Sequence, residues 1–165
     1  MAQKSAVKII YQENLISKVN IGAFTIATLV LLYAMFIHGD ANPGLITYGL
    51  LAFFVMAGIN FSKLSIMITT GGIIVGYGFF KQMVSWDQVE TCSIDRTPSV
   101  GWLIQMNSYQ GKQRVGYHIF AKPKIKLEAT GAWFRELTFS TNYPEHVLEI
   151  LTKGESRQGK KKAKK

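Results

Sequence analysis

The side chains suited to catalysis are few and widely separated in this 165-residue chain. His118 and His146 are two of its three histidines, and neither has the spacing to other residues that a zinc site or a nucleophile and its base would need. Thr70-Gly71-Gly72 is interpreted as a hairpin turn, because it lacks the Gly-Lys-Ser/Thr ending of a phosphate-binding loop. The single Cys92 excludes an internal disulfide and a cysteine metal cluster. We therefore expect no enzyme, and no catalytic, metal or cofactor site.

The dipeptide Trp86-Asp87 admits two interpretations. In a functional one, the carboxyl group lies in a pocket beneath the aromatic ring, where burial would shift its pKa. In a structural one, a buried Trp86 holds a turn in place and Asp87 caps backbone amides. We favour the structural interpretation.

Lysines supply the candidate contacts for anionic lipid. Lys122, Lys124 and Lys126 alternate along one segment, so they share a face that either meets acidic phosphate or is simply solvated. A lysine-rich tail ends the chain and contains Lys160, Lys161, Lys162, Lys164 and Lys165. Close to an anionic membrane, each such lysine contributes about 1 kcal/mol. RNA, an acidic protein patch or a disordered solubilising tail are the alternatives.

Two uncharged apolar runs, Ile21–Ile37 and Leu45–Phe61, organise the rest of the chain. Each has 17 residues and would reach roughly 25 Å at about 1.5 Å per residue, near the short end for a hydrocarbon core. The seven-residue connection ends in Asn-Pro-Gly, which favours a tight turn. The sequence predicts a transmembrane helical hairpin over residues 21–61, with His38 as an interfacial polar residue.

The net charge of +9 is unevenly distributed. Lys18 and Lys63 flank the outer ends of the apolar pair, whereas the connection carries only Asp40, so the positive-inside rule places both termini in the cytoplasm. Residues 64–152 are almost neutral, with eight basic and seven acidic side chains, and residues 153–165 contribute +6. A nucleic-acid-binding domain would carry this charge on its fold, so we expect a multi-pass cell-membrane protein without a nucleic acid partner.

Four segments are predicted. Residues 1–20 contain apolar side chains at loosely helical spacing, which indicates either a short interfacial helix or extra turns of the first membrane helix. Residues 21–61 are the hairpin, 64–152 a folded domain and 153–165 a basic, disordered tail. Short alternating runs with turns every 8–12 residues predict six or seven strands in the domain, followed by a helix that starts near Pro144. The fold class is α+β, with a small antiparallel barrel or two packed sheets.

Three pieces of the sequence carry a resemblance to a known family. They are the glycine-turned hairpin Leu64–Val75, the element Val84-Ser85-Trp86-Asp87-Gln88-Val89, and the strand that runs into a helix start over Leu137–Glu145. Together they resemble the bacterial and archaeal pleckstrin-homology-like (PH-like) domains that follow a pair of membrane helices. The resemblance implies a PH-like β domain closed by a C-terminal helix. Eukaryotic relatives bind phosphoinositides through lysines and arginines on the first hairpin, but Ile66–Val75 has no charge here.

These observations favour a binding role. We expect a non-catalytic, membrane-anchored accessory or scaffold subunit that binds a protein partner, or another copy of itself, through a strand edge or groove. Exposed aromatic residues would anchor that partner, and the candidates are Trp102, Tyr117 and Trp133. The alternative is a sensor of anionic membrane surfaces that uses the basic tail and the three alternating lysines.

Overall fold

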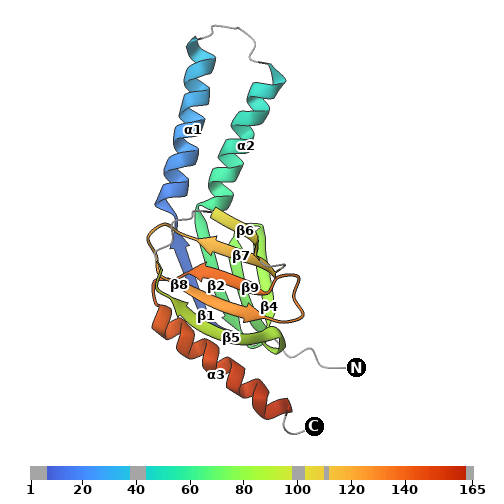
Figure 1. The fold of residues 1–165 in the computed structure, drawn as a ribbon. Coiled ribbons are helices and arrows are strands. Elements are labelled where there is room, and N and C mark those ends of the chain that lie inside the picture. The colour runs from blue at the N-terminus through green and yellow to red at the C-terminus, as the bar shows by residue number, and fades with distance from the viewer. Residues whose placement is uncertain (1–6, 38–43, 98–102, 110–111, 163–165) are drawn as a thin grey trace.

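The computed structural model describes residues 7–37, 44–97, 103–109 and 112–162. At 103, 109, 112 and 155–162 it describes the backbone alone. Over these residues the chain is an α+β protein with three α-helices, one short 3-10 helix and two sheets. Two helices project from one end of the paired sheets, and the third lies at the opposite end (Figure 1). The predicted α+β class is confirmed.

The first sheet is an antiparallel meander in the order β1-β2-β3-β4. Its strands are β1 (Ile9–Ile16), β2 (Lys63–Thr69), β3 (Gly72–Tyr77) and β4 (Phe80–Ser85). The predicted hairpin around Thr70 is present as β2 and β3, because apolar residues alternate on both sides of the glycine turn.

The strand β1 corrects the helix expected in residues 1–20. Ile9–Ile16 pairs antiparallel with β2, and the helix starts only at Lys18. Glu13 occupies an inward position of the strand, where the alternating pattern would have an apolar residue. Residues distant in the sequence stabilise it there. The hydroxyl of Thr141 donates to its carboxylate at 2.6 Å, and the backbone N–H of Asn142 donates at 2.9 Å. A buried carboxylate in a strand is tolerated because these donors satisfy it.

The second sheet has five strands in the order β5-β8-β9-β7-β6. Their bounds are β5 (Val89–Asp95), β6 (Leu103–Tyr109), β7 (Lys112–His118), β8 (Lys124–Ala129) and β9 (Glu136–Ser140). The pair β7–β9 is parallel, so the expected all-antiparallel arrangement is wrong at this point. β8 pairs with the distant β5. β9 then lies between β8 and β7, antiparallel to β8 and parallel to β7.

The two sheets enclose the core. Inward positions alternate along β2, β3, β8 and β9, and fully buried examples are Ile66, Val75, Leu127 and Phe139. The 3-10 helix Trp86–Gln88 leads from the first sheet into the second. Trp86 is buried there and its indole N–H donates to the Thr69 carbonyl at 3.0 Å, so the predicted structural role of this tryptophan is confirmed.

The helix α3 (Pro144–Lys162) packs beside β5 and places Val147 and Leu151 in the core. It begins where the sequence predicted a helix start. Its backbone continues to Lys162, so most of the expected disordered tail is helical. Lys164 and Lys165 lie outside the described residues.

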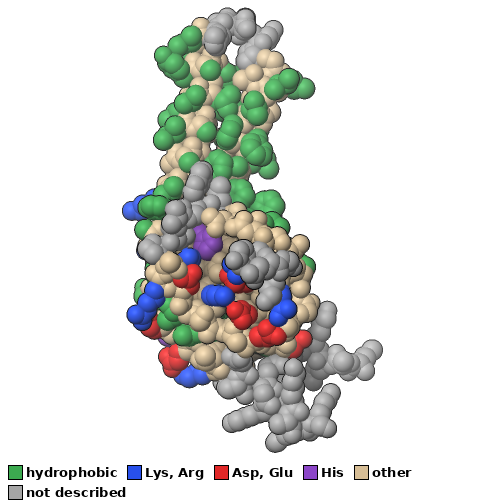
Figure 2. Space-filling view, in the orientation of Figure 1, with side chains coloured by type: hydrophobic (Ala, Val, Ile, Leu, Met, Phe, Trp, Pro, Cys, Tyr) green, Lys and Arg blue, Asp and Glu red, His purple; other side chains and the backbone are tan. Residues whose placement is uncertain are grey.

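The helices α1 (Lys18–Ile37) and α2 (Leu45–Phe61) form the predicted pair. Hydrophobic side chains cover both of them, whereas charged side chains gather on the β domain (Figure 2). α1 has the length and hydropathy to cross a membrane, and only 6% of its most apolar window is buried inside the protein. α2 is equally apolar but shorter, with 17 residues. Residues 38–43 of the connection, which include His38, lie outside the described residues.

Candidate binding surfaces

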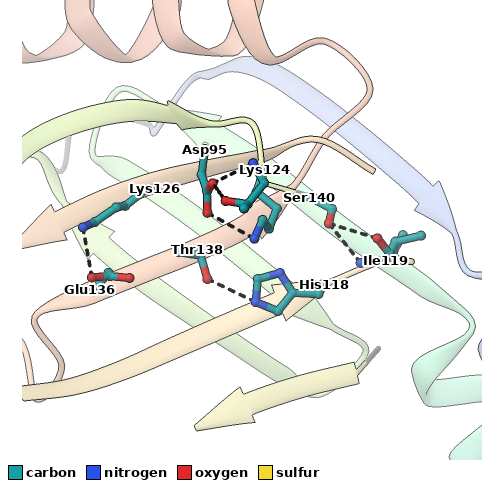
Figure 3. A network of polar contacts seen from close by, with 9 residues as sticks. Asp95, His118, Ile119, Lys124, Lys126, Glu136, Thr138 and Ser140 are labelled. Atoms are coloured by element: carbon teal, nitrogen blue, oxygen red, sulfur yellow. Dashed lines mark hydrogen bonds and ion pairs between the residues drawn. The ribbon is translucent and has the colours of Figure 1, made fainter. Parts of the chain in front are cut away.

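The predicted lysine face on β8 is neutralised within the protein. Lys124 Nζ lies 3.1 Å from a carboxylate oxygen of Asp95, and Lys126 Nζ lies 3.2 Å from both Glu128 and Glu136. Figure 3 shows the pairs Lys124–Asp95 and Lys126–Glu136 on the second sheet. Two of the three lysines expected to meet anionic lipid are therefore held by carboxylates of neighbouring strands. Lys122 is exposed in the turn before β8.

The same face continues as a network of side chains with alternating charges. Arg114 on β7 reaches Glu136 at 3.2 Å, so that carboxylate joins the charged groups of β7 and β8. At the other end of this network, burial alone would raise the pKa of the Asp95 carboxyl group. Hydrogen bonds from Thr97 and Lys124 outweigh the effect of burial, so the pKa is lowered. Because the two signs are interspersed, this face does not select an anionic partner.

His118 lies at the edge of this network and is almost completely buried. Its imidazole covers Gly116, where an added Cβ would meet Nε2 at 2.1 Å, and its Nε2 is 3.2 Å from the Thr138 hydroxyl. Nδ1 has no hydrogen-bond partner among the described residues. Burial, together with the charge of Lys124, lowers the pKa of His118 from 6.5 to about 4, against a smaller opposing effect of Asp95. The ring is therefore neutral at physiological pH.

The predicted aromatic anchors divide into three cases. Tyr117 is buried between the sheets, so its assignment as a surface anchor is wrong: Val115, Tyr117 and Ile119 alternate on the inward face of their segment. Trp133 is 50% exposed, and its indole N–H donates to the Gln82 side chain at 3.2 Å. Trp102 lies outside the described residues.

For the tail lysines the structure gives only the backbone. Lys160, Lys161 and Lys162 belong to the last turn of α3, and the description stops before Lys164. Their predicted contacts with anionic lipid remain a prediction. Among the described residues, no cluster of three or more His, Cys, Asp or Glu has the arrangement of a metal site.

The edge strand β6 is a candidate binding surface that sequence reasoning did not identify. It is the last strand of the second sheet and pairs with β7 alone among the described strands. Its seven residues, Leu-Ile-Gln-Met-Asn-Ser-Tyr, include no charge and no proline. An edge with these properties is open to pairing with another extended chain. The uncharged run was visible in the sequence, but its place at a sheet edge was not.

A small pocket accompanies this edge. Its volume is about 150 Å³, and its lining includes Met106 of β6 and Trp133 of the β8–β9 turn. Met106 pairs with the buried Val115 and so belongs to the inward side of the sheet, yet it is 65% exposed. Beyond β6 the second sheet leaves this apolar side chain without cover. The strand edge thus combines backbone hydrogen-bonding groups with a recess for an apolar side chain.

The three other sheet edges are protected. β4 carries Lys81, and β5 carries Glu90 and Asp95 and has α3 beside it. At β1, Glu13 accepts a hydrogen bond from Asn142, and the rings of Tyr11 and His146 meet at 5.6 Å, so the start of α3 is held against this strand. Charge or a covering element is how proteins prevent strand addition at an edge. β6 alone lacks both among the described strands.

Comparison with known proteins gives no relative from which a function can be transferred. No family model, no curated protein and no solved structure matches the chain. The PH-like resemblance therefore remains a prediction, and the function is inferred from the surfaces of the molecule.

Proposed function

We propose that this protein is a non-catalytic, membrane-anchored accessory or scaffold subunit whose β6 edge binds an extended segment of a protein partner. The observation that carries the proposal is the β6 edge, which has no charged side chain and no covering element among the described residues, with the pocket beside it at Met106 and Trp133. A partner segment would add as a further strand, with backbone hydrogen bonds giving affinity and one apolar side chain in the pocket giving specificity.

The pairing of β1 with β2 supports a two-span anchor. β1 leads directly into α1, and α2 leads directly into β2, so the helical pair is an insertion between two adjacent strands. The backbone N–H of Ser17 donates to the Ser62 carbonyl at 2.8 Å, which brings the helix bases together. If α1 crosses a bilayer, α2 has to bring the chain back. Its 17 residues span about 25 Å, which a slightly thinned bilayer accommodates.

The surface of the helical pair suits lipid. An open, almost entirely apolar cleft of about 440 Å³ runs between α1 and α2. A removable secretory signal does not fit α1, because cleavage after it would remove β1 from the first sheet. Lys18 and Lys63 at the helix bases support a cytoplasmic location for the β domain and both termini, by the positive-inside rule.

The arrangement of the domain supports a PH-like assignment in part. Two packed sheets with a C-terminal helix beside them are what the resemblance implies. The parallel pair β7–β9 is a departure from an all-antiparallel barrel. We therefore assign function from the β6 edge rather than from the ligand sites of that family.

Co-purification from the native membrane tests the proposal. The tagged full chain is solubilised in mild detergent, and the co-purifying proteins are quantified at low and high salt. We expect a protein at fixed stoichiometry that resists high salt and that is lost from Met106→Lys, because a lysine at the edge opposes strand addition. The matched control is Met83→Lys, since Met83 is similarly exposed (55%) but lies on β4.

Three results would overturn the proposal. The first is retention of the partner by Met106→Lys to the same extent as by the control. In the second, two differently tagged copies of this chain purify together through the edge, which would make it a self-association surface. The third is recovery of lipid alone, which would favour the membrane-sensing alternative.

A further inference from the structure

Among the described residues of the β domain, the most exposed aromatic side chain belongs to the turn between β3 and β4. Phe79 is 91% exposed and the adjoining Phe80 is 55% exposed. The ring of Phe80 stacks on Phe61, the last residue of α2, with centroids 5.6 Å apart and planes 6° from parallel. These phenylalanines therefore extend the apolar surface of the helical pair onto the end of the β domain.

The turn is fixed to the end of α2. The side-chain oxygen of Asn60 accepts a hydrogen bond from the backbone N–H of Phe79 at 2.9 Å. Gly78 adopts a φ of +41°, and a Cβ at this position would lie 1.9 Å from the same Asn60 oxygen. Only glycine satisfies both the conformation and the close approach. Phe79 is consequently held at a set position beside the helix instead of on a loose loop.

The charged residues of this segment have one sign. Lys63 starts β2 and Lys81 follows Phe80, and both are exposed. The register places them at the same end of the sheet, because Leu64 pairs with Tyr77 and Lys81 pairs with Gly76. The sequence contains no carboxylate between Asp40 and Asp87. Exposed aromatic residues with flanking lysines are the combination found at the boundary between acyl chains and anionic headgroups.

We infer that the β3–β4 turn is a membrane-seated wedge. Phe79 and Phe80 enter the headgroup and acyl boundary beside α2, and Lys63 and Lys81 contact lipid phosphates. The occupant of this surface is the bilayer, because the aromatic patch is continuous with the apolar helices. The inference rests on the proposed membrane-spanning hairpin. Its consequence is that the β domain has a fixed orientation to the membrane, and does not swing on its helices.

Site-directed spin labelling of the full chain tests the wedge. The chain carries Cys92→Ser and is reconstituted into vesicles of neutral and anionic phospholipid. A nitroxide is attached at Phe79→Cys, and its accessibility to oxygen and to a water-soluble nickel reagent is measured. Because Phe79 is so exposed, this substitution leaves the fold intact. We expect the ratio of oxygen to nickel accessibility to be several-fold higher at position 79 than at Met106→Cys on β6.

A third label shows whether a negative result concerns only the β3–β4 turn or the membrane-spanning hairpin as well. Ile59 is 73% exposed on the last turn of α2, so Ile59→Cys reports whether the hairpin is in lipid. If the label at 59 is in lipid and the label at 79 is in water, the wedge is wrong and the hairpin stands. A label at 59 that is in water overturns both. Lipid-like accessibility at 79 that requires a co-purified protein would instead assign the patch to a partner.

Discussion

His118 illustrates how burial of one titratable residue makes stability depend on pH. The unfolded chain binds a proton on this imidazole near pH 6.5, whereas the folded protein resists protonation until about pH 4. Stability is therefore complete above the unfolded pKa and falls as the pH decreases from about 6.5 towards 4. The loss amounts to at most about 3.5 kcal/mol, since each pKa unit corresponds to about 1.4 kcal/mol.

Thermal unfolding of the detergent-solubilised full chain at pH 7 and pH 5 checks this prediction. We expect a lower melting temperature at pH 5, and a smaller difference between the two pH values for His118→Gln. The pKa of the neighbouring Asp95 is lowered by its hydrogen bonds, so this carboxyl group keeps its charge over the range and does not produce the same change. An unchanged pH difference in the variant would show that another group is responsible.

Individual site residues were only partly predictable from sequence. The alternation of Val115 and Tyr117 contains the signal that Tyr117 is buried, but its aromatic character suggested an interface anchor. The ion pairs of Lys124 and Lys126 join strands that are distant in the chain, so spacing along the sequence could not reveal them. Trp133 is exposed, as an anchor has to be, but its contact with a partner stays a prediction.

At the scale of elements, the contact between α3 and the 3-10 helix depends on one glycine. Gly154 lies in α3, where replacement of glycine by alanine ordinarily stabilises a helix by about 1 kcal/mol. A Cβ at this position would approach the Trp86 ring carbons to 2.6–2.9 Å. The ring cannot move away freely, because its N–H is bonded to the Thr69 carbonyl inside the core.

We therefore predict that Gly154→Ala destabilises the protein. Overpacking of this kind costs about 1–3 kcal/mol, which exceeds the gain in helix propensity. Thermal unfolding followed by tryptophan fluorescence measures the effect. Gly49→Ala in α2 is the matched control, since nothing lies within 4 Å of its added Cβ, and it should be at least as stable as the parent chain. A Gly154→Ala chain more stable than the parent would contradict the prediction.

Most elements were predictable, and the exceptions have a common cause. The hairpin β2–β3, the strands β5 and β8 and the start of α3 follow from local alternation and turn residues. β1 was missed because its inward Glu13 is stabilised by Thr141 and Asn142, more than 120 residues away. Local patterns do not contain such long-range compensation.

At the scale of the whole molecule, the strand order determines how the helices are joined and which strands are edges, and local sequence patterns do not specify either. Apolar runs predicted two helices, but the pairing of β1 with β2 is what ties their outer ends together. Likewise, the insertion of β9 between β8 and β7 determines that β6 becomes an edge. The candidate binding edge is thus a property of the topology, and the sequence alone could not have located it.

This topology requires the number of membrane crossings to be even. Gln12 on β1 precedes the hairpin and Glu90 on β5 follows it, and both are exposed. In a Cys92→Ser background, we expect Gln12→Cys and Glu90→Cys to react with a membrane-impermeant maleimide only after the cells are permeabilised. Ala41→Cys in the connection should react in intact cells, because two crossings place it outside.

The pattern of labelling distinguishes the alternatives physically. Protection of all three cysteines in intact cells would mean that neither helix crosses, and the hairpin would then lie along the membrane or against a partner. Labelling of Gln12→Cys but not of Glu90→Cys would imply a single crossing. That result would require β1 and β2 to lie on opposite sides of the bilayer and so would break the first sheet. Because β1 places Leu15 in the core and its Glu13 accepts hydrogen bonds from Thr141 and Asn142, a single crossing is incompatible with this fold of the β domain.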